Sequence, residues 1–487
     1  MPFACWVSGM FDIGGMGLGP VHIVAFSITF LVIITVSIRS GRNVRDADTF
    51  VAGHGTGGLG ITMGVFMSLA VGGGCTIGTA QLAFQFGFSG MWFTLGTSLG
   101  FVLLAQLLTV PLRNSGQKTV HDLFAARFGT VAGTVSTILS GVCMLPTAVS
   151  QVASASILLG QVLAVPHKLS VAITIALMLV TVLFGGVIAS GYVGRIKILL
   201  TGGALLVCLA LVIFHTYGLR TFWEELPAAS YITLFSRGGA RDLFNAVAIG
   251  FGMLAIQSNA MGILSAKSVA TAKRALYICA AIVPLLGFCS TCVGMYMRTA
   301  YPQIDPAVSF PLFILRYFPP AAGGVLIATL LLSVVTSGAN ASMGIGVILS
   351  REIVRRLRCI RPSGRGELLL NRIVITAVLL SCMALVLVQK GQITILDWNY
   401  ISGSLRSAIV FPAFWATVRC KRSIPRGYVI AAMLLGPMSV VCDYLFLNIQ
   451  GGPLTAGLLA GFLCVLVGWL REHHTTNGEA TSPKNTE

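Results

Sequence analysis

The sequence predicts an all-α membrane protein that crosses the bilayer many times, and three observations support this class. Of its 487 residues, 55% are hydrophobic and only 10% are charged, and the mean hydropathy is +0.88. A soluble chain carries roughly a quarter charged residues. The apolar residues form about 13 runs, most of them near the length of about 20 residues that a transmembrane helix needs. Basic residues cluster between alternate runs, as the positive-inside rule requires.

Each apolar run is taken as one membrane span, and the connections set the orientation. One side of the membrane receives most of the Lys and Arg, including Arg195 with Lys197 and the run between residues 351 and 372. We therefore expect the N-terminus outside and the short polar tail 471–487 in the cytoplasm of a cell membrane protein. The predicted spans are residues 20–38, 59–86, 90–111, 130–164, 169–193, 197–218, 243–264, 275–297, 320–349, 371–389, 399–418, 427–447 and 452–470.

Composition also argues against other classes of protein. The net charge of +17 lies in loop clusters, which argues against nucleic-acid binding. The 12 cysteines are scattered singly and mostly in apolar runs, so we interpret them as small buried hydrophobic residues. Cys289 and Cys292 form the only C-x-x-C, with no second pair or His nearby, so we expect no metal or redox site there. No catalytic motif stands out, and no obligatory protein partner is evident.

The run 59–86 contains three consecutive glycines, Gly72 to Gly74, at mid-membrane. Each glycine disfavours helix by about 1 kcal/mol relative to Ala. The spacing from Gly74 to Gly78 also fits close packing of small residues between helices. A helix that is broken to bind a ligand and a tightly packed helix both explain the glycines.

Internal symmetry favours the broken helix. Residues 59–218 and 243–418 each contain five spans, so the second unit must lie inverted relative to the first, with 20–38 and 427–470 peripheral. The second unit also opens on an interrupted span, in which glycines flank the polar residues 257–259. Paired interruptions in inverted halves indicate a transporter site at the midplane. The outer segment 298–320 contains five prolines around an apolar patch at 310–318, and we expect a short helical cap there, over the outer mouth.

Five short motifs resemble the sodium:solute symporter family, the relatives of bacterial proline, pantothenate and galactose symporters. They are Ile77-Gly78, the stretch 119–129 (TVHDLFAARFG), 264–268 (LSAKS), 334–342 (VVTSGANAS) and 411–415 (FPAFW). The resemblance covers residues 20–470 and implies a five-plus-five inverted-repeat (LeuT-like) core of an all-α polytopic membrane protein, with one extra helix before it and two after it.

The resemblance implies a sodium site between the first broken span and the span 320–349. It assigns hydroxyl ligands to Thr336 and Ser337, and carbonyl ligands to Ser68, Val71 and Ser333. Hard cations prefer oxygen ligands, and a helix break frees carbonyls to supply them. The alternative is that Thr336 and Ser337 merely bond to their own helix.

The resemblance also places the solute beside both breaks. Its predicted ligands are Gly74, Cys75, Thr76, Gln151, Gly252, Met253 and Gln257, with Thr147 and Ser150 as possible additions. Gln257 matches a family glutamine, whereas Met261-Gly262 departs from the Gln-Arg pair that often follows. Helix N-termini at the breaks favour a carboxylate.

Charged residues inside apolar runs are functional candidates. Arg406 either snorkels to the surface or contacts a gate or a solute carboxylate, and for Asp443 we expect a structural role. Ala70 and Gly194 stand where some relatives have acids, so we expect neither a second sodium site nor a proton relay.

The predicted function is sodium-coupled import of a small organic solute, amino acid-like or carboxylate-like, by alternating access. The expected partners are the solute, Na⁺ as the transported coupling ion, and the lipid bilayer. The alternative is a transporter-like sensor that binds solute without moving it.

Overall fold

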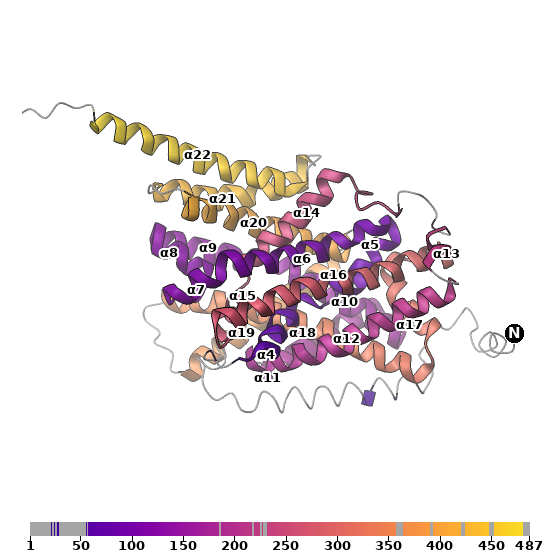
Figure 1. Ribbon diagram of the computed structural model, residues 1–487. Helices are drawn as coiled ribbons and strands as arrows, with labels where there is room; N and C mark the ends of the chain where they lie inside the picture. The colour runs from indigo at the N-terminus through magenta and orange to yellow at the C-terminus, as the bar shows by residue number, and fades with distance from the viewer. Residues whose placement is uncertain are drawn as a thin grey trace, which may run out of the picture.

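The computed structural model describes residues 57–184, 187–216, 219–224, 231–356, 364–389, 393–419, 424–447 and 452–480, together with residues 21, 24, 27, 28, 55 and 226. Its regular elements are helices, and the one β-bridge among these residues joins Gly57 to Ala266. The long helices run side by side in one bundle (Figure 1). Helices α21 and α22 pack on each other and on α20 along one edge of that bundle.

The first predicted repeat contains a broken helix followed by the spans that pack on it. The helices of this part are α4 (Leu59–Ala70), η2 (Gly74–Gly78), α5 (Thr79–Phe86), η3 (Gly87–Met91), α6 (Trp92–Leu103), η4 (Leu104–Leu108), α7 (Thr109–Ser115), α8 (Val120–Phe128), α9 (Thr130–Cys143), α10 (Leu145–Leu163), α11 (His167–Phe184) and α12 (Val187–His215).

The second predicted repeat follows the short helix α13 (Leu219–Glu224) and is followed by two peripheral helices. The remaining helices are α14 (Gly239–Gly252), η6 (Met253–Ala255), α15 (Gln257–Ser265), α16 (Val269–Ala300), η7 (Pro306–Val308), α17 (Ser309–Tyr317), α18 (Pro320–Arg356), α19 (Gly364–Val388), α20 (Ile395–Arg419), α21 (Arg426–Cys442), η8 (Asp443–Leu447) and α22 (Pro453–Ala480).

Within the described residues, 8 helices are long and apolar enough to cross a membrane, or 9 if the bent pair α14–η6 with α15 is one span. The shorter apolar helices Leu59–Ala70 and His167–Val182 account for part of the difference from the predicted spans, because a break shortens the first of them. The predicted span 20–38 lies almost wholly outside the described residues. A short helix, α17, is present where the cap was predicted at 310–318.

One sequence prediction needs correction. We expected Lys197 in a connection between the spans 169–193 and 197–218, but α12 begins at Val187 and carries Lys197 inside a continuous helix. At the C-terminal end, α22 continues to Ala480, so the first part of the predicted tail 471–487 is helical.

Small residues set the spacing of the core around the first break. A Cβ on Gly194 of α12 would lie 1.9 Å from the carbonyl oxygen of Gly64 on α4, so the two helices touch backbone to backbone. On the other side of α4, Phe66 packs edge-to-face on Phe101 of α6. The broken helix is thus held by close packing on both sides.

Candidate cation and solute site at two helix breaks

The first broken span is interrupted at its glycines, as predicted. Helix α4 ends at Ala70, Val71 has φ −89° and ψ 86°, and a π-helical turn resumes at Gly74. A Cβ on Gly72 would lie 2.6 Å from Ser337 Oγ, and one on Gly73 would lie 2.2 Å from Ser154 Oγ. The glycines therefore serve both interpretations: they break the helix and they allow neighbouring helices to approach it.

Side chains from two helices bind the backbone that the break exposes. Gln151 of α10 accepts a hydrogen bond from the Gly73 N–H at 2.9 Å. From α18, Ser333 Oγ donates to the Val71 carbonyl at 2.8 Å, and Ser337 Oγ lies 2.9 Å from the Ser68 carbonyl and 3.3 Å from that of Val71. Four of the five residues predicted to bind sodium are therefore brought together here.

Thr336 is the exception in that set. Its hydroxyl donates to the carbonyls of Leu332 and Ser333 on its own helix, at 2.7 and 3.2 Å. This is the back-bonding arrangement that the alternative interpretation described.

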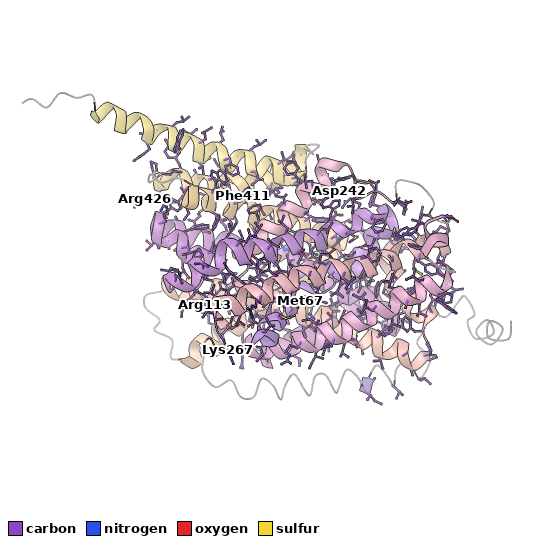
Figure 2. The ribbon with its side chains drawn as sticks, viewed as in Figure 1. Met67, Arg113, Asp242, Lys267, Phe411 and Arg426 are labelled. Atoms are coloured by element: carbon purple, nitrogen blue, oxygen red, sulfur yellow. The ribbon has the colours of Figure 1, made fainter. Side chains whose placement is uncertain are left out.

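The amino group of Lys197 lies in the middle of this cluster. Lys197 Nζ is 2.7 Å from the Ser68 carbonyl, 2.9 Å from the Ser333 carbonyl and 2.8 Å from Ser337 Oγ. The side chain is only 1% exposed. Met67, labelled in Figure 2, is the residue before Ser68 and lies within the bundle, so this ammonium is held deep in the protein.

The second break has a different form. Helix α14 ends at Gly252, Ile256 is extended, and α15 continues at an angle of 59°. Asn259 Nδ2 donates to the Met253 carbonyl at 3.0 Å and closes the bend.

Arg406 of α20 binds the end of the first half of this broken helix. Its Nη1 donates to the Gly252 carbonyl at 3.0 Å and its Nε to the Ser402 carbonyl at 3.1 Å, and the residue is 3% exposed. A cation at a helix C-terminus is favoured by the helix dipole. The interpretation of Arg406 as a snorkelling residue is therefore wrong, because the guanidinium is buried at the break.

The predicted solute residues are distributed over the two breaks. Cys75 is fully buried, and the Thr76 hydroxyl donates to the Gly72 carbonyl of its own turn at 3.0 Å. A Cβ on Gly74 would lie 2.9 Å from the ring of Phe93 and 3.3 Å from Asn399 Nδ2. At the second break, Gly252 binds Arg406, Met253 packs on Gly100 of α6, and Gln257 is a buried residue at the start of α15.

Helix α20 connects the two halves of this set. Asn399 contacts the first break and donates to Ser150 Oγ at 2.8 Å, while Arg406, seven residues later on the same face, contacts the second break. Sequence reasoning missed Asn399 as well as Lys197. Both are polar or charged residues at the edge of an apolar run, and such residues are normally assigned to the adjoining loop.

Two cavities open near the site without reaching the predicted solute residues. One, of about 380 Å³, lies between α5, α10 and the start of α20, where Gln81, Gln389 and Ile395 line it. The other, of about 950 Å³, is lined by residues that include Arg237, Asp397 and Asp443. None of the seven predicted solute ligands lines either cavity.

Two basic residues support the second break from the side of α7 and α8. Arg113, labelled with Lys267 in Figure 2, donates to the carbonyls of Ile263 and Ala266 at 3.1 and 2.6 Å, at the C-terminal end of α15. His121 of α8 is buried near the Ala255 backbone and lies 2.6 Å from Ser136 Oγ through Nδ1. Burial lowers the pKa of His121 to about 4, so the ring is neutral near pH 7.

Comparison with solved structures identifies the fold. The chain is similar to a Na⁺-coupled sialic acid symporter solved in a substrate-bound outward-open state, with a TM-score of 0.76 at 14% identity over 92% of this chain and 96% of that one. It is also similar to MhsT solved with L-phenylalanine, with a TM-score of 0.53 at 13% identity over 85% of this chain and 98% of that one. The predicted LeuT-like fold is thereby confirmed, although the number of spans is not.

Sequence comparison identifies the family. The chain is 28% identical to the uncharacterized symporter YwcA of Bacillus subtilis (strain 168) over 42% of its length and 40% of that protein. It is 21% identical to the osmoregulated proline transporter OpuE of the same organism, over 86% of this chain and 88% of the relative. The model of the sodium:solute symporter family matches residues 49–436, which is most of the chain. The protein is therefore a multi-pass membrane transporter by family and fold, and it belongs to the sodium:solute symporter family.

Proposed function

We propose that the chain is a sodium-coupled symporter that imports a small organic carboxylate across the cell membrane. Family membership supports sodium as the coupling ion and solute import as the activity. The solute would lie between the two helix breaks, with Gly74, Cys75, Thr76 and Gln151 on one side and Gly252, Met253 and Gln257 on the other. The coupling ion would bind among Ser68, Val71, Ser333, Thr336 and Ser337.

The observation that carries the carboxylate assignment is the buried charge of Arg406. Its described hydrogen-bond partners are the neutral carbonyls of Ser402 and Gly252. A buried charge is costly unless it is paired, and an anionic solute beside Gly252 would supply the pair. The start of α15 at Gln257 directs the positive end of a helix dipole into the same break.

Alternating access follows from the two broken helices. Closure around solute and ion would order the broken segments, and rocking of the helices that carry them would open the site to the cytoplasm. The basic connections support an N-terminus outside and a C-terminus inside. A reporter fused after Arg358 should then face the cytoplasm, and one inserted at Gln303 should face outside.

A paired binding and transport experiment tests this proposal. Purified protein is screened by thermal shift against amino acids and monocarboxylates, each beside its uncharged amide, with and without Na⁺. The best ligand is then tested for counterflow into proteoliposomes. We expect an acid to stabilise the protein and its amide not to, and we expect the labelled acid to accumulate.

Arg406→Met should remove the preference for acid over amide, because the carboxylate loses its cation. Arg274→Met, at an exposed position of α16, is the matched loss of positive charge and should leave that preference intact. Binding without counterflow would instead identify a sensor, and equal stabilisation by acid and amide would contradict the carboxylate assignment.

A further inference from the structure

The Lys197 ammonium is surrounded by the same oxygens that the proposed sodium site requires. An ammonium has three N–H donors, and its three partners here lie 2.7, 2.9 and 2.8 Å from Nζ. All three partners, the carbonyls of Ser68 and Ser333 and the hydroxyl of Ser337, are predicted ion ligands at the break. The side chain thus carries one positive charge into the position of a monovalent ion and satisfies each of its donors there.

A second cation cannot share this position. Two like charges a few ångströms apart inside a protein repel by several kcal/mol even at an effective dielectric constant near 20. The elements packed on α12 bring no anion near this position: α4, α16 and residues 320–350 of α18 contain no Asp or Glu, and the nearby groups are the thiols of Cys75 and of Cys289 on α16.

The second break has the same arrangement, a glycine followed by a buried cation, which indicates that the position of Lys197 is a feature of the fold. Gly194 lies three residues before Lys197, and Gly403 lies three residues before Arg406. A Cβ on Gly194 would meet the Gly64 backbone, four residues before the Ser68 carbonyl that Lys197 binds.

A Cβ on Gly403 would meet the Ala248 backbone in the same way, four residues before the Gly252 carbonyl that Arg406 binds. In each half of the chain, the fifth core span approaches the first on a glycine and places a cation at the end of its first half-helix.

We propose that the Lys197 ammonium and Na⁺ are mutually exclusive occupants of the first break, so that sodium binds only when the ammonium has withdrawn from Ser68, Ser333 and Ser337. This inference rests on the proposed function for the identity of the ion, but it concerns occupancy alone and needs no knowledge of the solute. The Lys197 ammonium therefore competes with the coupling ion for the same oxygens.

Sodium binding to purified protein tests the proposal. The variants are Lys197→Met, which keeps the stem and removes the charge, Lys197→Ala, and Lys168→Met as a control at an exposed lysine. Binding of ²²Na⁺ is titrated for each. We expect the two Lys197 variants to bind sodium about tenfold more tightly or better, because one charge-assisted hydrogen bond alone is worth about that factor. The control should match the wild type.

Equal sodium affinity in the wild type and in a folded Lys197 variant would overturn the proposal. An experimental density map of the wild-type protein at high sodium chloride tests the same proposal without a variant. It should show either Nζ at its three oxygens or an ion among them. Both together would overturn the proposal, as would neither. A protein that fails to transport any acid but still shows this exclusion would refute the proposed function and leave the inference standing.

Discussion

Each of the two helix breaks holds one buried cation, but the two cations differ in kind. At the first break a lysine binds two carbonyls and a hydroxyl, and at the second an arginine binds two carbonyls. An ammonium is a compact point charge on a flexible stem, whereas a guanidinium is planar, delocalised and always charged. The lysine ammonium can therefore move away from its oxygens, whereas the arginine guanidinium is expected to stay bound at the helix terminus. The first break is therefore suited to a cation that exchanges, and the second to a cation that stays in place.

Gly194 and Gly403, which lie three residues before the two cations, should differ most in their tolerance of substitution. Gly194→Ala places a Cβ 1.9 Å from a backbone oxygen that cannot turn aside, whereas Gly403→Ala meets the Ala248 backbone at 3.1 Å and the flexible Ile249 side chain at 3.0 Å. We expect Gly194→Ala to cost about 3 kcal/mol or more and Gly403→Ala about 1 kcal/mol. Thermal unfolding in detergent measures both, and equal losses would show that the two helix contacts are alike.

The second break should be the more sensitive to acid because His121 supports it. The pKa of His121 is about 4 in the folded protein and 6.5 in the unfolded chain, so the unfolded chain binds more protons between those values. Stability from this residue is complete above pH 6.5 and falls by up to about 3 kcal/mol as the pH drops to 4. Unfolding measured over this range should lose that slope in His121→Gln. An unchanged slope would assign the acid sensitivity elsewhere.

The hydroxyls of Ser337 and Thr336 should contribute differently to the stability of the protein. Ser337→Ala removes a partner of both Lys197 and the Ser68 carbonyl, and should destabilise the protein by about 1–3 kcal/mol. Thr336→Ala removes only bonds within its own helix and should cost less than about 1 kcal/mol. Thermal unfolding without sodium measures both costs. The reverse order would mean that the hydroxyl of Thr336 joins the cation site in solution.

The smallest effect is expected where the connection before α14 meets α20. Arg237 forms a 3.1 Å ion pair with Asp397, and the two side chains are 9% and 22% exposed. Both residues line the cavity of about 950 Å³, which admits water that screens the pair, so a double-mutant cycle of Arg237→Met and Asp397→Asn should give a coupling of about 1 kcal/mol or less. A coupling of several kcal/mol would place this pair among the contacts that control the site.

Much of the fold follows from the sequence because its signals are local. The apolar runs, the glycines at 72–74 and the polar interruption at 257–259 each act on their own helix, and both breaks occur where they were expected. The meeting of Ser68, Val71, Ser333 and Ser337 was also anticipated, although it rested on a family resemblance and not on spacing.

Lys197, Asn399 and the burial of Arg406 could not be predicted in the same way. Hydropathy places a basic residue at the edge of a run in a loop, but α12 starts ten residues before Lys197 and takes it into the bundle. Three oxygens from α4 and α18, more than a hundred residues away in the chain, bind its amino group. Such a partner set is a property of the packed helices and leaves no local pattern.

The sodium dependence of uptake tests the competition between Lys197 and sodium most directly. Wild type and Lys197→Met are reconstituted into proteoliposomes, and uptake of the solute found by thermal shift is titrated with sodium. We predict that removal of the ammonium lowers the sodium concentration for half-maximal uptake by about tenfold or more, because the ion no longer competes with a charge held in its own site. The same sodium concentration for half-maximal uptake in both proteins would contradict the account.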